Sequence, residues 1–213
     1  MNSHRRRLLA ALAASAALCA PLAPASAQSS LPAAPALEGR ALVTALRGGG
    51  YVLYLRHTST DFGENDAQMT DYENCATQRN LTDKGRAEAR AIGASLRALQ
   101  IPIGDVLASP YCRTLETGRL VFGSATATPA VRGGPARPDN AERYADLRRL
   151  LGTAPPSGTN VAISSHGNPF FGVAGAPYLA EGEIAVVRPL GGNQFRIEAR
   201  VRWDEWASLA VAR

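Results

Sequence analysis

Beyond its first 30 residues the sequence has no long uncharged apolar run, and it has very little lysine, histidine or cysteine. Without an uncharged stretch of about 18 residues, that part is not expected to insert stably into a membrane. After residue 27 a single lysine, Lys84, accompanies 19 arginines, and no basic cluster favours a nucleic-acid partner. With 46% apolar and 19% charged residues among 213, the composition excludes general disorder and suffices for one globular domain.

The N-terminus has the pattern of an export signal. Arg5-Arg6-Arg7 precede the uncharged run 8–22, and Ala25-Ser26-Ala27 is a signal-peptidase pattern. A buried N-terminal helix is the alternative, but a core helix is amphipathic, whereas this run is apolar on all sides. We therefore expect a periplasmic or secreted protein whose net charge falls from +5 to +2, because three basic residues leave with the leader. The expected organisation is a signal peptide over 1–27, a linker over 28–36 and a single domain over 37–213.

Two cysteines, Cys75 and Cys112, remain after that cleavage. In an oxidising compartment we expect them to form a disulfide, which would stabilise the fold by roughly 3–4 kcal/mol through the loop it closes. Two buried free thiols are the alternative. Neither cysteine has the CxxC spacing of a zinc or redox site.

Short apolar runs typical of buried strands alternate with helical patterns along the chain. This alternation predicts an α/β fold, a three-layer α/β/α sandwich around a mainly parallel sheet. A glycine-rich turn at 191–193 joins the last two expected strands as a hairpin. The expected strands are 51–55, 105–109, 160–165, 183–188 and 195–201, and the expected helices are 37–46, 82–99, 113–122, 141–151 and 203–209.

Two histidines and two arginines follow the expected strands. His57, preceded by Arg56, comes directly after the first strand, and His166 follows the third. Arg113 lies a few residues past the second. Because the carboxyl ends of parallel strands share one edge of a sheet, these side chains are expected to converge. Guanidinium forks match phosphate oxygens, and a neutral imidazole can attack phosphorus.

A metal site is the rival interpretation of this cluster. The sequence has no HxH or HExxH pair, and two arginines would repel a cation. We therefore expect an anion pocket that needs no metal or other cofactor.

Four segments resemble, in order, the motifs of one family over about residues 51 to 190. Residues 55–58 are similar to its Arg-His-Gly motif, with Thr58 in place of glycine, and residues 80–85 to its L-T-x-x-G helix start. Residues 108–117 resemble its S-P-x-x-R-x-x-x-T segment, and residues 164–168 its second-histidine motif. The family is the histidine phosphatase superfamily, also called phosphoglycerate mutase-like.

The resemblance implies a phosphomonoesterase. It implies that His57 attacks the phosphoryl group and becomes phosphorylated, and that water then hydrolyses the phosphohistidine without a metal. Arg56, Arg113 and His166 would hold the phosphoryl oxygens and stabilise the charge in transfer.

The remaining site residues are less marked in the sequence. We expect Glu183 to be the general acid, with Glu142, nearer the family's usual spacing, as the alternative. Ser59 and Thr60 are candidate phosphate contacts. Substrate selection is expected in the segments 58–78 and 124–140. The second carries Arg132 and Arg137, candidate contacts for a further anionic group.

Export narrows the expected substrate to a phosphorylated small molecule or glycan. Exported members of the resembled family include phosphatases acting on lipopolysaccharide heptose phosphates. The alternatives are a phosphoglycerate mutase-type phosphotransferase, a phosphohistidine protein phosphatase, and a non-catalytic module that binds a phosphorylated ligand.

Overall fold

The computed structural model describes residues 36–134 and 142–211. The expected signal peptide, nearly all of the linker, and Arg137 lie outside these residues. Within the described part, no helix is both long and apolar enough to cross a bilayer.

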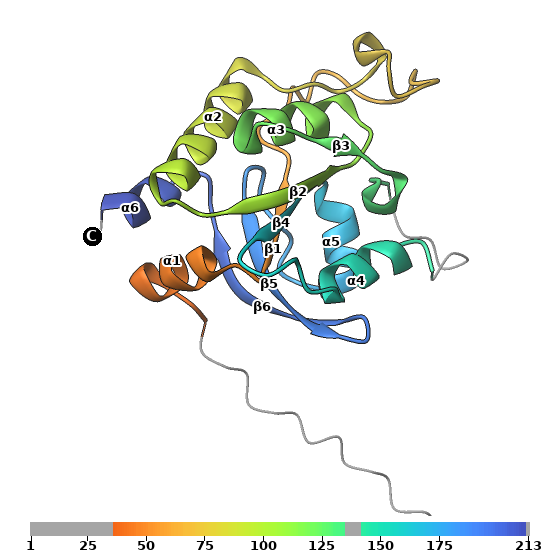
Figure 1. Ribbon diagram of the computed structural model, residues 1–213. Helices are drawn as coiled ribbons and strands as arrows, with labels where there is room; N and C mark the ends of the chain where they lie inside the picture. The colour runs from red at the N-terminus through yellow and green to blue at the C-terminus, as the bar shows by residue number, and fades with distance from the viewer. Residues whose placement is uncertain (1–35, 135–141, 212–213) are drawn as a thin grey trace, which may run out of the picture. The chain divides into compact units, whose positions relative to one another are not determined.

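A six-stranded sheet forms the centre of the described chain (Figure 1). Its strand order is β3-β2-β4-β1-β5-β6. The four strands β3, β2, β4 and β1 run parallel, and β5 runs antiparallel to both of its neighbours. The predicted mainly parallel sheet is therefore confirmed. The strands are β1 Val52–Arg56, β2 Ile103–Ala108, β3 Thr126–Ala127, β4 Asn160–Ser165, β5 Ile184–Gly191 and β6 Gln194–Val201.

Helices cover both faces of this sheet and complete the predicted three layers. Because successive side chains of a strand point to opposite faces, β1 contributes to two cores. Leu53 and Leu55 pack with α1, α2, α3 and α6, whereas Val52 and Tyr54 pack with α4 and α5. The helices are α1 Gly39–Gly48, α2 Asp83–Ala98, α3 Cys112–Phe122, α4 Ala145–Gly152, α5 Gly167–Ala174 and α6 Trp206–Val211.

The structure also contains elements that the sequence pattern does not predict. α5 begins directly after His166, and its sequence contains two glycines and a proline, which read as a loop. β3 has only two residues, too few for a periodic signal. Two short 3₁₀ helices, η1 Cys75–Thr77 and η2 Pro129–Val131, lie in segments expected to be loops.

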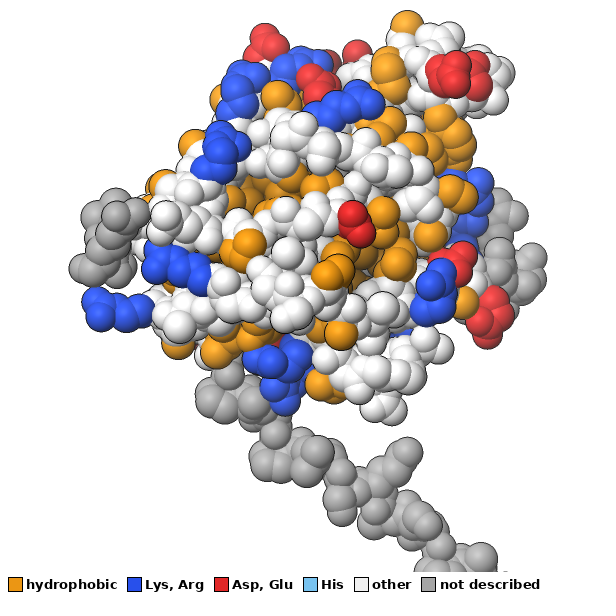
Figure 2. Space-filling view, in the orientation of Figure 1, with side chains coloured by type: hydrophobic (Ala, Val, Ile, Leu, Met, Phe, Trp, Pro, Cys, Tyr) orange, Lys and Arg blue, Asp and Glu red, His pale blue; other side chains and the backbone are white. Residues whose placement is uncertain are grey.

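Charged side chains of both signs are interspersed over the face shown in Figure 2. The exposed carboxylates and guanidinium groups form several local ion pairs, such as Arg149 with Asp146 at 3.2 Å.

Candidate active site

The carboxyl ends of the parallel strands bring the predicted residues together. Arg56 at the end of β1 pairs with Ser165 at the end of β4, and the His57 N–H donates to the Ser165 carbonyl at 2.9 Å. Ser109, which follows β2, hydrogen-bonds through its hydroxyl with His166 Nε2 at 2.8 Å. The register of the sheet therefore places both histidines at one edge.

His57 is held in the tautomer of a nucleophile. Its Nδ1 lies 3.0 Å from the Thr58 carbonyl oxygen. Because a carbonyl only accepts, Nδ1 carries the proton and Nε2 keeps its lone pair. Burial lowers the pKa of His57 well below its ordinary value, against the opposing effect of the Thr58 hydrogen bond, and the charges of Arg113 and Arg56 lower it further. The imidazole is therefore neutral and able to attack phosphorus at neutral pH.

His166 lies beside His57, with the two ring centroids 5.5 Å apart. The Tyr54 hydroxyl donates to the His166 carbonyl at 2.7 Å, and Ser109 holds the ring as described above. Burial lowers the pKa of His166 well below its ordinary value, and the neighbouring His57 and Arg113 lower it further. The second imidazole is thus neutral and fixed in place.

Three arginines line the same cavity, which has a volume of about 270 Å³ in the described part of the chain. Arg56, Arg79 and Arg113 each have a buried Nε with no hydrogen-bond partner among the described residues. A buried donor without a partner is costly, and three around one cavity fit an anion that accepts from them. The other lining residues include Glu64, Asn65, Asp66, Tyr111, Gly134, Gly167, Asn168 and Tyr178.

Arg79 is not predicted by the sequence analysis. It lies in a polar stretch expected to be a loop, and the chain folds back there through a bridge between Thr60 and Leu81. Burial lowers the pKa of Arg79, and the neighbouring charge of Arg113 lowers it further. The one feature of the sequence that could have pointed to Arg79 is its position directly before residues 80–85, which resemble the L-T-x-x-G motif.

The side chains of Ser59 and Thr60 turn away from this cavity. The Ser59 hydroxyl donates to Glu88 at 2.9 Å, and the Thr60 hydroxyl donates to Glu181 at 2.7 Å. Neither is among the residues that line the cavity in the described chain. Both hydroxyls are thus taken up by buried or half-buried carboxylates, which anchor the loop after β1.

The structure also places Glu183 and Glu142 away from the cavity. The Glu183 carboxylate accepts from Arg200 Nε at 2.8 Å, and Glu142 is exposed. Neither lines the cavity within residues 36–134 and 142–211. The carboxylates that do line it are Glu64 and Asp66.

Glu181, which the sequence analysis did not single out, lies beside the Nδ1 side of His57. One of its oxygens is 3.8 Å from His57 Nδ1 and 3.6 Å from Arg56 Nη2. Arg56 is also held by a hydrogen bond from Nη1 to the Leu179 carbonyl at 2.7 Å. These contacts fix the guanidinium group beside His57.

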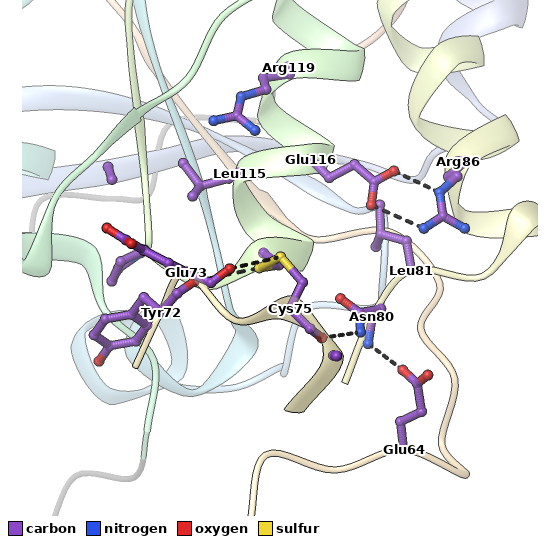
Figure 3. A pocket seen from close by; sticks show the side chains of 14 residues that line it. Glu64, Tyr72, Glu73, Cys75, Asn80, Leu81, Arg86, Leu115, Glu116 and Arg119 are labelled. Carbon is purple, nitrogen blue, oxygen red and sulfur yellow. Dashed lines mark hydrogen bonds and ion pairs between the residues drawn. A yellow bond between two sulfur atoms is a disulfide. The ribbon is translucent and has the colours of Figure 1, made fainter. Parts of the chain in front are cut away.

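The predicted disulfide is confirmed, with Cys75 and Cys112 joined and their Cα atoms 5.7 Å apart. It ties the segment between β1 and α2 to the first residue of α3, directly before Arg113. Figure 3 shows a neighbouring groove of about 1080 Å³, which is lined in part by the segment between β1 and α2. There the Asn80 side chain donates to the Cys75 carbonyl at 2.8 Å, and the Glu64 carboxylate accepts from the Asn80 N–H at 2.8 Å.

Residues 52–133 match the model of the histidine phosphatase superfamily (branch 1). A comparison with curated proteins gives no match. Among solved structures, a mycobacterial glucosyl-3-phosphoglycerate phosphatase in complex with inorganic phosphate has a TM-score of 0.52 at 15% identity, covering 71% of this chain and 96% of that one. A phosphoserine phosphatase mutant from Entamoeba histolytica in complex with phosphoserine has a TM-score of 0.50 at 12% identity, covering 73% and 98%. The two structures have the same fold as this chain.

Proposed function

We propose that this chain is a phosphatase of the histidine phosphatase superfamily and that it hydrolyses a phosphate monoester through a covalent phosphohistidine on His57. One observation carries the proposal. The cavity of about 270 Å³ combines a neutral histidine whose Nε2 keeps its lone pair with the Nε–H groups of Arg56, Arg79 and Arg113, which have no partner in the described part of the chain. This is the arrangement that a nucleophile and a phosphoryl transition state with negative charge on its non-bridging oxygens need.

In the first step the His57 Nε2 lone pair forms a bond to phosphorus while the bond from phosphorus to the ester oxygen breaks. The guanidinium groups and His166 accommodate the non-bridging oxygens, on which charge accumulates. The departing oxygen takes a proton, and we assign that proton to Glu64, a carboxyl group that lines the cavity.

In the second step water attacks the phosphorus of the phosphohistidine. The nitrogen–phosphorus bond breaks, its electron pair returns to Nε2, and the Glu64 carboxylate takes the proton from water. The products are the alcohol and inorganic phosphate. Because arginines supply the positive charge, the proposal requires no metal ion.

The substrate is proposed to be a phosphorylated small molecule or glycan outside the cytoplasm. The disulfide supports an oxidising compartment, where such bonds persist. Tyr111 and Tyr178 line the cavity together with the arginines and are the candidate contacts for the organic part of the substrate.

The test is hydrolysis of para-nitrophenyl phosphate in EDTA by the wild type, His57→Gln and His166→Gln. We expect His57→Gln to lower kcat by on the order of 10⁴-fold or more, because it removes the nucleophile. Brief mixing with ³²P-labelled substrate should give an acid-labile label on the wild type and on His166→Gln, but none on His57→Gln. Circular dichroism spectra of the three proteins control for folding.

Two results would contradict the proposal. A His57→Gln protein that keeps its label would place the phosphoryl group on another residue. Loss of wild-type activity in EDTA, restored by a divalent cation, would show that a metal takes part.

A further inference from the structure

Asp66 makes the most extensive contacts to the cavity arginines, although it lies in a segment with no predicted catalytic role. Its two carboxylate oxygens accept from Arg113 Nη1 and Nη2, both at 2.9 Å. The oxygen that binds Nη1 also accepts from the backbone N–H of Arg79 at 2.9 Å. One carboxylate therefore contacts two of the arginines proposed to hold the phosphate.

These contacts determine which N–H donors of the Arg113 guanidinium group remain for a ligand. Its Nη1 also donates to the Arg79 carbonyl at 3.1 Å, so both terminal nitrogens are engaged by the protein. The guanidinium group lies over the Tyr111 ring, 4.5 Å from its centroid. Among the described residues, the donors that remain for a ligand are the buried Nε–H, which has no partner, and the second N–H of Nη2. The bidentate pair with Asp66 thus fixes the plane of the Arg113 guanidinium group and, with it, the direction of the Nε–H bond.

The negative charge of Asp66 also offsets repulsion within the cavity. Arg79 and Arg113 are close enough for each positive charge to disfavour the other. Burial raises the pKa of Asp66, but hydrogen bonds from Arg113 and Arg79 outweigh it and hold the pKa below its ordinary value. The carboxylate is therefore ionised at neutral pH and compensates the two guanidinium groups.

Asp66 lies on a segment that is tied to the rest of the fold on both sides. On one side the Glu64 carboxylate accepts from the Asn80 N–H, and on the other the disulfide joins Cys75 to Cys112 (Figure 3). A carboxylate on a tied segment is suited to holding a catalytic group in place.

We propose that Asp66 is a positioning residue of this phosphatase, which orients the guanidinium group of Arg113 and anchors the backbone of Arg79, so that both side chains meet the phosphoryl oxygens. The inference rests on the proposed function, in which these arginines bind the phosphoryl group. The opposing hypothesis makes Asp66 an internal competitor that phosphate must displace. The two hypotheses predict opposite changes in phosphate affinity when the carboxylate is removed.

The experiment compares Asp66→Asn and Asp66→Glu with Asp71→Asn. Asp71 is the matched control, because its exposed carboxylate caps the Glu73 and Asn74 N–H groups in the same segment and does not line the cavity among the described residues. The readouts are kcat and KM for para-nitrophenyl phosphate, and the affinity for inorganic phosphate by calorimetry.

For Asp66→Asn we expect kcat/KM to fall about 100-fold, the effect of a small misplacement at a reacting centre. Phosphate affinity should fall as well, and Asp66→Glu should recover part of both losses because it keeps the charge. Asp71→Asn should stay within about twofold of the wild type. In an Arg113→Lys background the Asp66→Asn effect should shrink, because the group that Asp66 orients is gone.

Tighter phosphate binding by Asp66→Asn, or an unchanged kcat/KM, would overturn the positioning role. An undiminished Asp66→Asn effect in the Arg113→Lys background would also overturn it, and this double-variant comparison still decides if a single variant is destabilised. A wild type that binds phosphate without turning over substrate would instead overturn the proposed function, so the two failures are distinguishable.

Discussion

At the scale of single residues, burial sets the chemistry of this site. His57 and His166 are almost completely shielded from solvent, and burial is the largest cause of their lowered pKa values. An imidazole that stays neutral is ready to attack, whereas the arginines keep their charge under any ordinary condition. The site thus combines an uncharged imidazole, the proposed nucleophile, with a positively charged cavity.

These pKa directions predict how His57 titrates. In ¹H–¹³C NMR spectra, the His57 ring signal, identified by its loss in His57→Gln, should titrate well below pH of about 6.5, the usual value for histidine. Because the unfolded chain binds protons near that pH and the folded chain does not, the free energy of unfolding should fall as pH drops below about 6.5. Urea unfolding at several pH values, with the urea concentration at the midpoint as the readout, checks this expectation. A midpoint pH at or above 6.5 for His57 would show that burial does not control its protonation.

The proton donor gives a second prediction at this scale. Glu64→Gln should slow hydrolysis of an alkyl phosphate by about 10²–10⁴-fold, the range for general acid catalysis, because the departing alkoxide needs a proton. Its effect on kcat/KM for para-nitrophenyl phosphate should be much smaller, because that leaving group departs without a proton and kcat/KM reports phosphoryl transfer to His57, not the later hydrolysis in which Glu64 is the base. Glu183→Gln and Glu142→Gln, assayed with the same two substrates, test the two carboxyl groups expected from the sequence. If Glu183→Gln or Glu142→Gln slowed hydrolysis of the alkyl phosphate much more than that of para-nitrophenyl phosphate, that residue would be the proton donor in place of Glu64.

At the scale of elements, the strands and the segment between β1 and α2 behave differently. The strand ends place His57 and His166 through backbone pairing alone, and the sequence pattern is sufficient to locate them. The segment after β1 follows no periodic pattern. Its course depends on the disulfide, the Thr60–Leu81 bridge and side-chain contacts such as Asp66 with Arg113. This is why Arg79 and Asp66 escaped prediction.

At the scale of the whole molecule, the two apolar faces of β1 explain the three layers. Each face is covered by helices, so the edge that carries His57 and His166 is the part of the central strands left for polar side chains. The proposed export also belongs to this scale, because it decides which phosphate esters the protein meets and whether its disulfide forms.

The export proposal predicts a defined mature protein. When the full-length gene product is made in a Gram-negative host, the intact mass of the protein from the periplasm or medium should correspond to a chain that begins at Gln28. The mass should rise by the hydrogens of two thiols on reduction, and a Cys75→Ser variant should show no such rise. Cytoplasmic protein retaining Met1, with both thiols free, would contradict the proposal.

The sequence by itself determined the α/β class, the strands that carry the histidines, and the pairing of Cys75 with Cys112. These features follow from apolar periodicity, motif order and a small number of cysteines, all of which are local or countable properties. Only the tertiary structure decided which charged groups share the cavity. Glu183 binds Arg200 instead of facing the cavity, whereas Asp66 reaches Arg113 across 47 residues of chain. Such contacts depend on how distant segments pack, which a linear pattern of charges does not encode.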